Sequence, residues 1–224
     1  MEHQVKQLAK LLLDGQDREA KELIQQYQKE DSILAIYEKL ITPAMYYIGE
    51  LWENNEISVA DEHLATAVCD MILTELSQEK TKNVTIDKKV MLLGLEEEQH
   101  YIGLRMVATV FKHEGWDVRY LGPNLPLNHM LSFIRKWKPE VVGISIALPY
   151  RLPKLIEYIE AIVQLEDEPE MLIGGRMANK VLSLDASKSD KVHVVMSLRQ
   201  LQDWIVTGNI KYSEEGEKDS NATT

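Results

Sequence analysis

Residues 89–103 have the sequence KVMLLGLEEEQHYIG, which determines how the C-terminal half of the chain is interpreted. Residues 90–94 form a short apolar run that ends in a glycine, which is typical of a strand buried in a parallel sheet. An amphipathic segment follows over 101–114. The alternation continues, with strands expected over 117–121, 141–146, 171–173 and 192–196 and helices over 127–137, 153–165 and 198–206. This spacing predicts an α/β domain with a doubly wound, five-stranded parallel sheet of the flavodoxin or Rossmann-like type.

The first 79 residues have a different pattern, in which apolar side chains recur every three or four positions, as in one-faced helices. Asp31 or Ser32 is expected to cap a third helix, which Pro43 breaks or restarts because proline has no amide hydrogen to donate. Ser58 is expected to cap the next helix, with Glu62 one position beyond the capping-box spacing. We therefore expect a helical-bundle domain over 1–80, a linker over 81–88, the α/β domain over 89–210 and a disordered tail over 211–224.

The composition is that of a globular protein with an acidic balance. The 224 residues include 25 Lys and Arg against 36 Asp and Glu, so 25 − 36 gives a formal net charge of −11. Phosphate contacts need clusters of Lys and Arg, and none is visible, so direct nucleic-acid binding is not expected. The single cysteine, Cys69, excludes a disulfide scaffold. No apolar run approaches the roughly 18 residues that span a bilayer and no signal peptide is apparent, so we expect a cytoplasmic protein without a membrane partner.

A candidate ligand-binding loop follows the first strand, at the sheet edge where ligands bind in this fold. In residues 94–103, GLEEEQHYIG, His100 lies two residues after Glu98 and three before Gly103. A neutral imidazole is a good transition-metal ligand, and a carboxylate that binds its other ring nitrogen fixes the tautomer. The alternative is a solvated acidic loop before a helix start, where carboxylates suit the helix dipole.

Two further signals are expected at the same edge. Ser145 ends the third strand, and the pair Gly174-Gly175 follows the fourth. The serine hydroxyl is expected to bind a ligand nitrogen or only a neighbouring carbonyl. The glycines leave room for a flat ligand or form a simple turn.

Together, the E/D-x-H-x-x-G loop, the serine and the glycine pair resemble the cobalamin-binding domain of methionine synthases, corrinoid methyltransferases and mutases. The resemblance implies that cobalamin binds here, with an imidazole below the cobalt and the nucleotide tail in a deep slot. A glutamate stands in this sequence where most of that family has aspartate. The residues implied are the lower axial ligand His100, its partner Glu98, Gly103 at the slot entrance, and Ser145, Gly174 and Gly175 around the nucleotide base.

The helical half carries a second resemblance. Residues 51–63, LWENNEISVADEH, contain Trp52, nine further residues and then Glu62-His63. This W-x9-E-H pattern resembles the cap of the adenosylcobalamin photoreceptors that control carotenoid genes. The resemblance implies that Trp52, Glu62 and His63 form the pocket above the corrin. The alternative is that Trp52 packs in the core and that Glu62-His63 only begins a helix.

These resemblances imply a stand-alone light sensor that binds adenosylcobalamin, is not an enzyme, and acts through a regulatory protein partner or its own oligomerisation. Two departures qualify the resemblance: no helix-turn-helix segment precedes the cap in this sequence, and Glu53 stands where some relatives have a histidine. One alternative is a corrinoid protein that carries a methyl group in a methyltransferase system. Another is an antirepressor or scaffold that binds a different tetrapyrrole or none.

Overall fold

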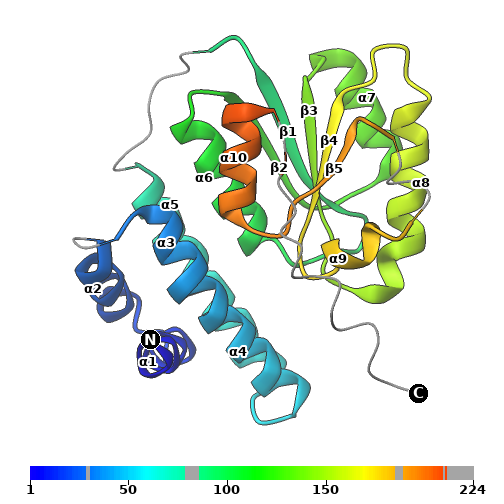
Figure 1. Cartoon of the computed structure of the whole chain (residues 1–224). Helices are drawn as coiled ribbons and strands as arrows, with labels where there is room; N and C mark the ends of the chain where they lie inside the picture. Colours follow the sequence, from blue (N-terminus) through cyan, green and yellow to red (C-terminus); the bar gives the residue numbers. More distant parts are fainter. Residues whose placement is uncertain (29–30, 79–85, 185–188, 209, 211–224) are drawn as a thin grey trace, which may run out of the picture.

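The structure is a computed structural model, and it describes residues 1–28, 31–78, 86–184, 189–208 and 210 (Figure 1). Its N-terminal part is a helical bundle, as expected. The bundle contains α1 (Glu2–Leu13), α2 (Asp17–Gln28), α3 (Ile33–Ile36), the π-helical turn η1 (Tyr37–Ile41), α4 (Thr42–Glu53) and α5 (Val59–Gln78). The expected tail over 211–224 and most of the expected linker lie outside the described residues.

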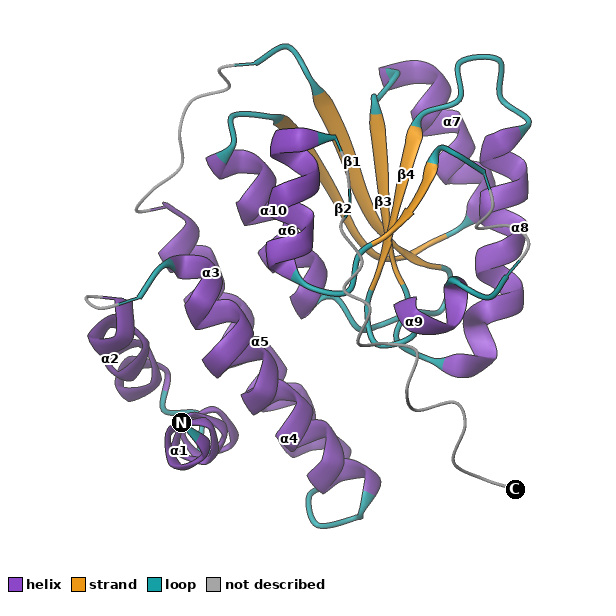
Figure 2. Cartoon of the chain, in the orientation of Figure 1, coloured by secondary structure: helices purple, strands orange, loops and turns teal. Residues whose placement is uncertain are grey.

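The C-terminal part is the predicted α/β domain. Five parallel strands lie in the order β2-β1-β3-β4-β5, so the strand order reverses between β1 and β3. Helices α6 and α10 cover one face of the sheet, and α7 and α8 cover the other (Figure 2). The elements are β1 (Lys89–Leu95), α6 (Ile102–His113), β2 (Asp117–Leu125), α7 (Leu127–Trp137), β3 (Val141–Ser145), η2 (Pro149–Arg151), α8 (Leu152–Val163), β4 (Glu170–Gly174), α9 (Ala178–Val181), β5 (Val192–Val194) and α10 (Leu198–Thr207).

Local polar contacts explain where the bundle helices begin. Ser32 is the cap of α3, and its hydroxyl accepts a hydrogen bond from the amide of Ala35 at 3.2 Å. At α5, Ser58 forms a reciprocal capping pair with Asp61, whose carboxylate accepts from the Ser58 amide at 2.8 Å. The capping carboxylate is therefore Asp61, and Glu62 is left for other contacts.

Of the two expectations for Pro43, the structure shows the restart: α4 begins with Pro43 in its first turn, and the chain is helical up to that point. The chain passes from α3 through η1 directly into α4, with Pro43 at the start of α4. In η1 the amide of Thr42 donates to the carbonyl of Tyr37, five residues back. This wider turn accommodates a proline that has no amide to donate.

The second strand is longer than expected. The sequence predicts a strand over 117–121, but β2 continues through Gly122 and Pro123 to Leu125. Gly122 has φ +79°, and the pairing register between β1 and β2 shifts on both sides of Leu93. This irregularity absorbs the glycine and the proline within an edge strand. The short helix α9 was not predicted.

The bundle packs against α6 (Figure 1). Ile102 and Met106 of α6 belong to the hydrophobic core of the bundle. The Arg105 guanidinium also reaches α5, where its Nε donates to Asp70 at 2.7 Å and its Nη2 to the Thr74 hydroxyl. Residues on one face of α6 therefore join the two halves of the molecule.

Candidate functional site

The candidate site lies at the carboxyl edge of the sheet, close to the reversal of strand order. Gly94, Ser145 and Gly174 pair in register across β1, β3 and β4. Leu92, two residues before Gly94, packs among the α6 and α10 side chains, so the alternation along a strand places this row on the same face. Three adjacent strands thus carry residues with little or no side chain at or next to their carboxyl ends.

The glycines at this edge serve different purposes. A Cβ added to Gly103, at the start of α6, would meet no atom within 4 Å. A Cβ added to Gly175 would lie 2.2 Å from the carbonyl oxygen of Ile146, and Gly175 has φ +106°. Gly175 is therefore required by the backbone, whereas Gly103 faces open space.

His100 and Glu98 form the pair that the sequence predicts. The Nδ1 of His100 lies 2.6 Å from Oε1 of Glu98, and the same oxygen accepts from the His100 amide at 3.1 Å. The other oxygen, Oε2, accepts from the amide of Ala147 at 2.9 Å. Glu98 is 0% exposed and the His100 side chain is 44% exposed. The alternative interpretation, a solvent-exposed acidic loop, is therefore wrong for Glu98.

The charge state of Glu98 follows from its surroundings. Burial acts to raise the pKa of the Glu98 carboxyl, but the hydrogen bonds from the His100 side chain, the Ala147 amide and the His100 amide outweigh burial and lower the pKa. A carboxylate at this position accepts the Nδ1 proton of His100. The lone pair of a neutral imidazole then lies on Nε2, which leaves that nitrogen as the one able to bind a metal.

The loop that carries this pair is held from several elements. The amide of Asn124 donates to the Glu98 carbonyl at 3.0 Å, and the Asn124 side chain accepts from the Glu97 amide at 2.7 Å. Glu97 and Asn124 both have positive φ values, of 63° and 56°. Arg151 pairs with the Glu97 carboxylate, and Lys154 lies 3.3 Å from the Glu96 carboxylate. The imidazole is therefore presented on a restrained loop.

The residues expected above the corrin lie at one end of the bundle. Trp52, near the end of α4, is 47% exposed, so packing in the core is wrong for it. On α5, Glu62 accepts a hydrogen bond from the Thr66 hydroxyl at 2.9 Å. The ring of His63 is well exposed, and its Nε2 lies 3.7 Å from Glu62. Trp52 and His63 are thus accessible to a ligand at this end.

One contact joins this end of the bundle to the sheet edge. Arg176 follows the glycine pair after β4, and its guanidinium carbon lies 4.9 Å from the centre of the Tyr46 ring on α4. Its Nη1 lies 3.8 Å from the carboxylate of Glu53, the residue next to Trp52. The predicted upper and lower site residues therefore belong to surfaces that approach one another.

The residues present fit a metal that is carried within a macrocycle. Among the described residues, no group of three or more His, Cys, Asp or Glu side chains is arranged to hold a bare metal ion. One histidine, oriented by a buried carboxylate, would suit a metal ion whose remaining ligands come from the cofactor itself. The open space at Gly103 and the row of small residues fit a bulky group beside that histidine.

Comparison with known proteins agrees with this chemistry. Two family models, each described as a B12 binding domain, match residues 4–77 and 88–196. The chain is a B12-binding protein. These matches confirm the predicted family, in which a helical cap is joined to a Rossmann-like cobalamin-binding domain. They support corrinoid binding by this chain. The individual roles of the predicted site residues stay predictions.

The sequence identity to individual curated proteins is below 30%. The chain is 27% identical over 112 residues to the HTH-type transcriptional repressor CarH of Myxococcus xanthus, covering 50% of this chain but only 37% of the repressor. It is 24% identical over 145 residues to the trimethylamine corrinoid protein of Methanosarcina barkeri, with 62% of this chain and 67% of that protein covered. A corrinoid protein of Desulfitobacterium hafniense is 22% identical over 182 residues, with 78% and 84% covered.

The fold of this B12-binding protein is also found in a solved structure. The monomethylamine corrinoid protein of M. barkeri superimposes with a TM-score of 0.72 at 16% identity, covering 91% of this chain and 97% of that one. In the described part of the chain, no helix is both long and apolar enough to cross a membrane.

Sequence reasoning missed the residues that restrain the histidine loop from a distance. Asn124 and Arg151 come from other loops, and Ala147 contributes only its backbone amide. The one local signal was that Asn124 follows a Gly-Pro pair, which is typical of a chain reversal.

Proposed function

We propose that this B12-binding protein is a cytoplasmic, non-catalytic light sensor that holds adenosylcobalamin between the bundle and the sheet. The observation that carries the proposal is the half-exposed Trp52 at the end of α4, with Glu62 and His63 on the adjacent helix. The similarity to the CarH repressor supports it. When bound, adenosylcobalamin supplies a cobalt–carbon bond that visible light breaks.

Each part of the chain has a defined task in this proposal. His100 would hold the cobalt from below through Nε2, and Glu98 keeps the proton on Nδ1. Trp52 would cover the upper group with its indole, and Glu62 and His63 would provide polar contacts beside it. These upper contacts depend on the adenosyl group, so its loss changes the state of the bundle that is favoured.

Helix α5 is suited to carry that change to the rest of the protein. Glu62 lies near its start, and Asp70 and Thr74 lie further along on the contact with Arg105. Arg105 belongs to α6, which begins directly after the His100 loop. The output we propose is a change in self-association or in binding of a regulatory protein, since a net charge of −11 opposes direct contact with nucleic acid.

A methyl-carrying corrinoid protein is the second candidate. It is supported by the corrinoid proteins of M. barkeri and D. hafniense, which match a larger share of this chain than CarH does. The pair His100 and Glu98 serves both candidates equally. The two proposals therefore differ at Trp52, because a methyl carrier must leave the upper face open to its partner enzymes.

The test is to load the chain with adenosylcobalamin in darkness and measure its molar mass by light scattering, before and after green light. A light-dependent change in mass, lost in Trp52→Ala but kept in a Trp137→Phe control, supports the sensor. Methyl turnover from methylcobalamin with an added methyltransferase, and no response to light, favours the carrier. If cobalamin spectra are the same with wild type and His100→Ala, neither proposal stands and the scaffold alternative is favoured.

A further inference from the structure

Arg176 makes an unusual bridge between the sheet edge and the bundle. Its guanidinium lies over the Tyr46 ring at 4.9 Å and near the Glu53 carboxylate at 3.8 Å. Between them, a Cβ added to Gly49 would lie 2.9 Å from its Nη2. Tyr46, Gly49 and Glu53 are three and four residues apart, so they form one face of α4.

This face of α4 is the one next to the predicted upper pocket. Trp52 comes three residues after Gly49 and directly before Glu53. Arg176 itself comes two residues after Gly174, which ends β4 at the opposite side of the site. The bridge therefore spans the two surfaces between which a corrin would bind.

The bridge differs from the contact that Arg105 makes between the bundle and the sheet domain. Arg105 lies on α6 and donates from Nε to Asp70 at 2.7 Å, a close charge-assisted hydrogen bond between side chains that are 28% and 31% exposed. The Arg176 side chain is 31% exposed, and its carboxylate partner is 61% exposed. The Arg176–Glu53 pair is therefore the longer and more exposed of the two ion pairs, and the weaker one.

We propose that Arg176 is a latch, which holds the bundle against the sheet edge in the cofactor-free protein and releases before a corrinoid enters. This inference rests on the corrinoid binding of the family and is independent of light sensing or methyl transfer. Gly49 is part of the latch, because the absence of its side chain lets the guanidinium lie against α4.

The size of the effect follows from the two contacts. An exposed ion pair and an exposed cation–π contact each shift an equilibrium by about two- to fivefold. If only the open form admits the cofactor, the association rate scales with the open fraction. Removing both contacts of the latch therefore raises the association rate by about four- to 25-fold and leaves the dissociation rate of the loaded protein unchanged.

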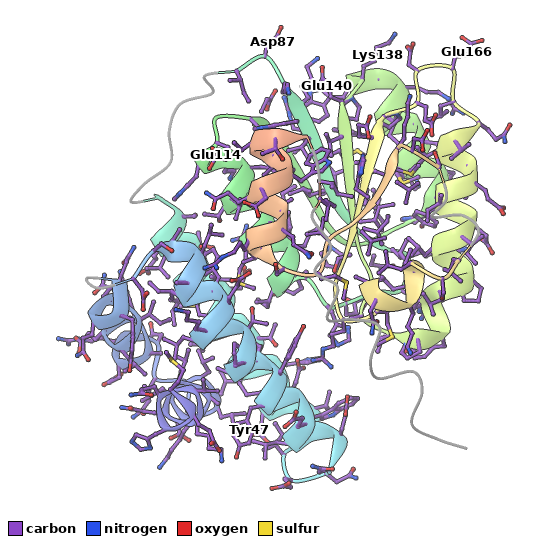
Figure 3. All side chains as sticks on the ribbon, in the orientation of Figure 1. Tyr47, Asp87, Glu114, Lys138, Glu140 and Glu166 are labelled. Carbon is purple, nitrogen blue, oxygen red and sulfur yellow. The ribbon has the colours of Figure 1, made fainter. Side chains whose placement is uncertain are left out.

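The experiment compares Arg176→Ala and Gly49→Ala with wild type in darkness. Alanine stabilises a helix interior relative to glycine, while its Cβ displaces the flexible guanidinium, so Gly49→Ala opens the latch without weakening the bundle. Arg135→Ala is the charge-matched control, because Arg135 lies in a groove with Lys138 and Glu140. Those two residues lie at the opposite end of the sheet (Figure 3).

Stopped-flow absorbance with hydroxocobalamin, and separately with adenosylcobalamin, gives the rates. The latch predicts faster association in both variants, no change in Arg135→Ala, and a double variant no faster than Arg176→Ala. Slower association or faster release in Arg176→Ala would identify a direct cofactor contact and overturn the latch. Unchanged rates in Gly49→Ala also overturn it. Failure of every protein, wild type included, to bind either cobalamin removes corrinoid binding and the latch together, whereas a missing light response affects only the proposed function.

Discussion

Replacement of Glu98 by glutamine tests how the site prepares its histidine. The carboxylate accepts from His100 Nδ1 at 2.6 Å, from the His100 amide at 3.1 Å and from the Ala147 amide at 2.9 Å. Glutamine has nearly the same shape but presents one NH2 group, which donates. In one orientation this group faces the Ala147 amide, leaving two donors together in a buried site. In the other it faces Nδ1, which must then accept, so the ring proton moves to Nε2.

The expected magnitude has two parts. Loss of a carboxylate that orients a metal-ligating histidine lowers metal affinity about 10- to 100-fold. A buried donor left without a partner costs about 1–3 kcal/mol of folding free energy. We therefore expect Glu98→Gln to fold with reduced stability and to bind cobalamin at least tenfold more weakly. Glu98→Asp keeps the charge and shortens the reach by one methylene, so its loss of affinity is smaller than that of Glu98→Gln.

Two measurements check this prediction. Absorbance titration with hydroxocobalamin gives the affinities. Electron paramagnetic resonance of the Co(II) form, with ¹⁵N-labelled histidine in the protein, reports whether an imidazole nitrogen binds cobalt. Wild type is expected to show the labelled nitrogen coupling, and His100→Ala to lose it. Wild-type affinity and coupling in Glu98→Gln would refute the role of the carboxylate in setting the tautomer.

Three further predictions concern the cap, the glycines and the thiol. Trp52→Ala lowers the dark affinity for adenosylcobalamin about tenfold, or about 1.4 kcal/mol, but the affinity for methylcobalamin less than twofold; equal losses for both cofactors would contradict an adenosyl pocket. Gly175→Ala, whose Cβ meets a carbonyl oxygen at 2.2 Å, lowers the free energy of unfolding in urea by about 3 kcal/mol. Gly103→Ala, in open space, changes it by less than about 1 kcal/mol, and equal shifts would refute the distinction. Burial raises the pKa of the Cys69 thiol to about 12, so a thiol reagent is expected to modify it only after unfolding; rapid labelling of the folded protein would contradict this.

The order of helices and strands follows from local patterns, and for this reason it was predictable. The expected helix over 127–137 and the observed α7 coincide, because its apolar spacing is regular and Pro126 fixes its start. The range predicted for strand β2 is shorter than the observed strand, because the continuation of β2 past Gly122-Pro123 depends on its pairing with β1. No local pattern encodes a register shift between two strands.

In the candidate site too, contacts between residues close in sequence are predictable, and contacts between distant segments are not. His100 and Glu98 are two residues apart, so their pairing is visible in the sequence and confirmed by a 2.6 Å contact. The contacts of Asn124 with the histidine loop and of Arg176 with α4 join distant segments. They arise only once β1, β2 and β4 bring their carboxyl ends to one edge, and no spacing along the chain specifies them.

The predicted site has a part built from the sheet and a part built from the bundle, and this explains why relatives with different functions match this chain. The lower half of the site is built from strand ends, where Gly94, Ser145 and Gly174 lie in register, and from one histidine loop. Any protein that binds a corrinoid this way needs those features, so they do not distinguish a sensor from a carrier. The upper half depends on side chains of α4 and α5, which the backbone does not dictate. If Trp52 lies above the cobalt as we propose, its indole would obstruct the approach of a methyl donor, whereas a sensor gains from covering its upper group. The chemistry at Trp52 therefore discriminates between the two functions more sharply than any similarity in fold.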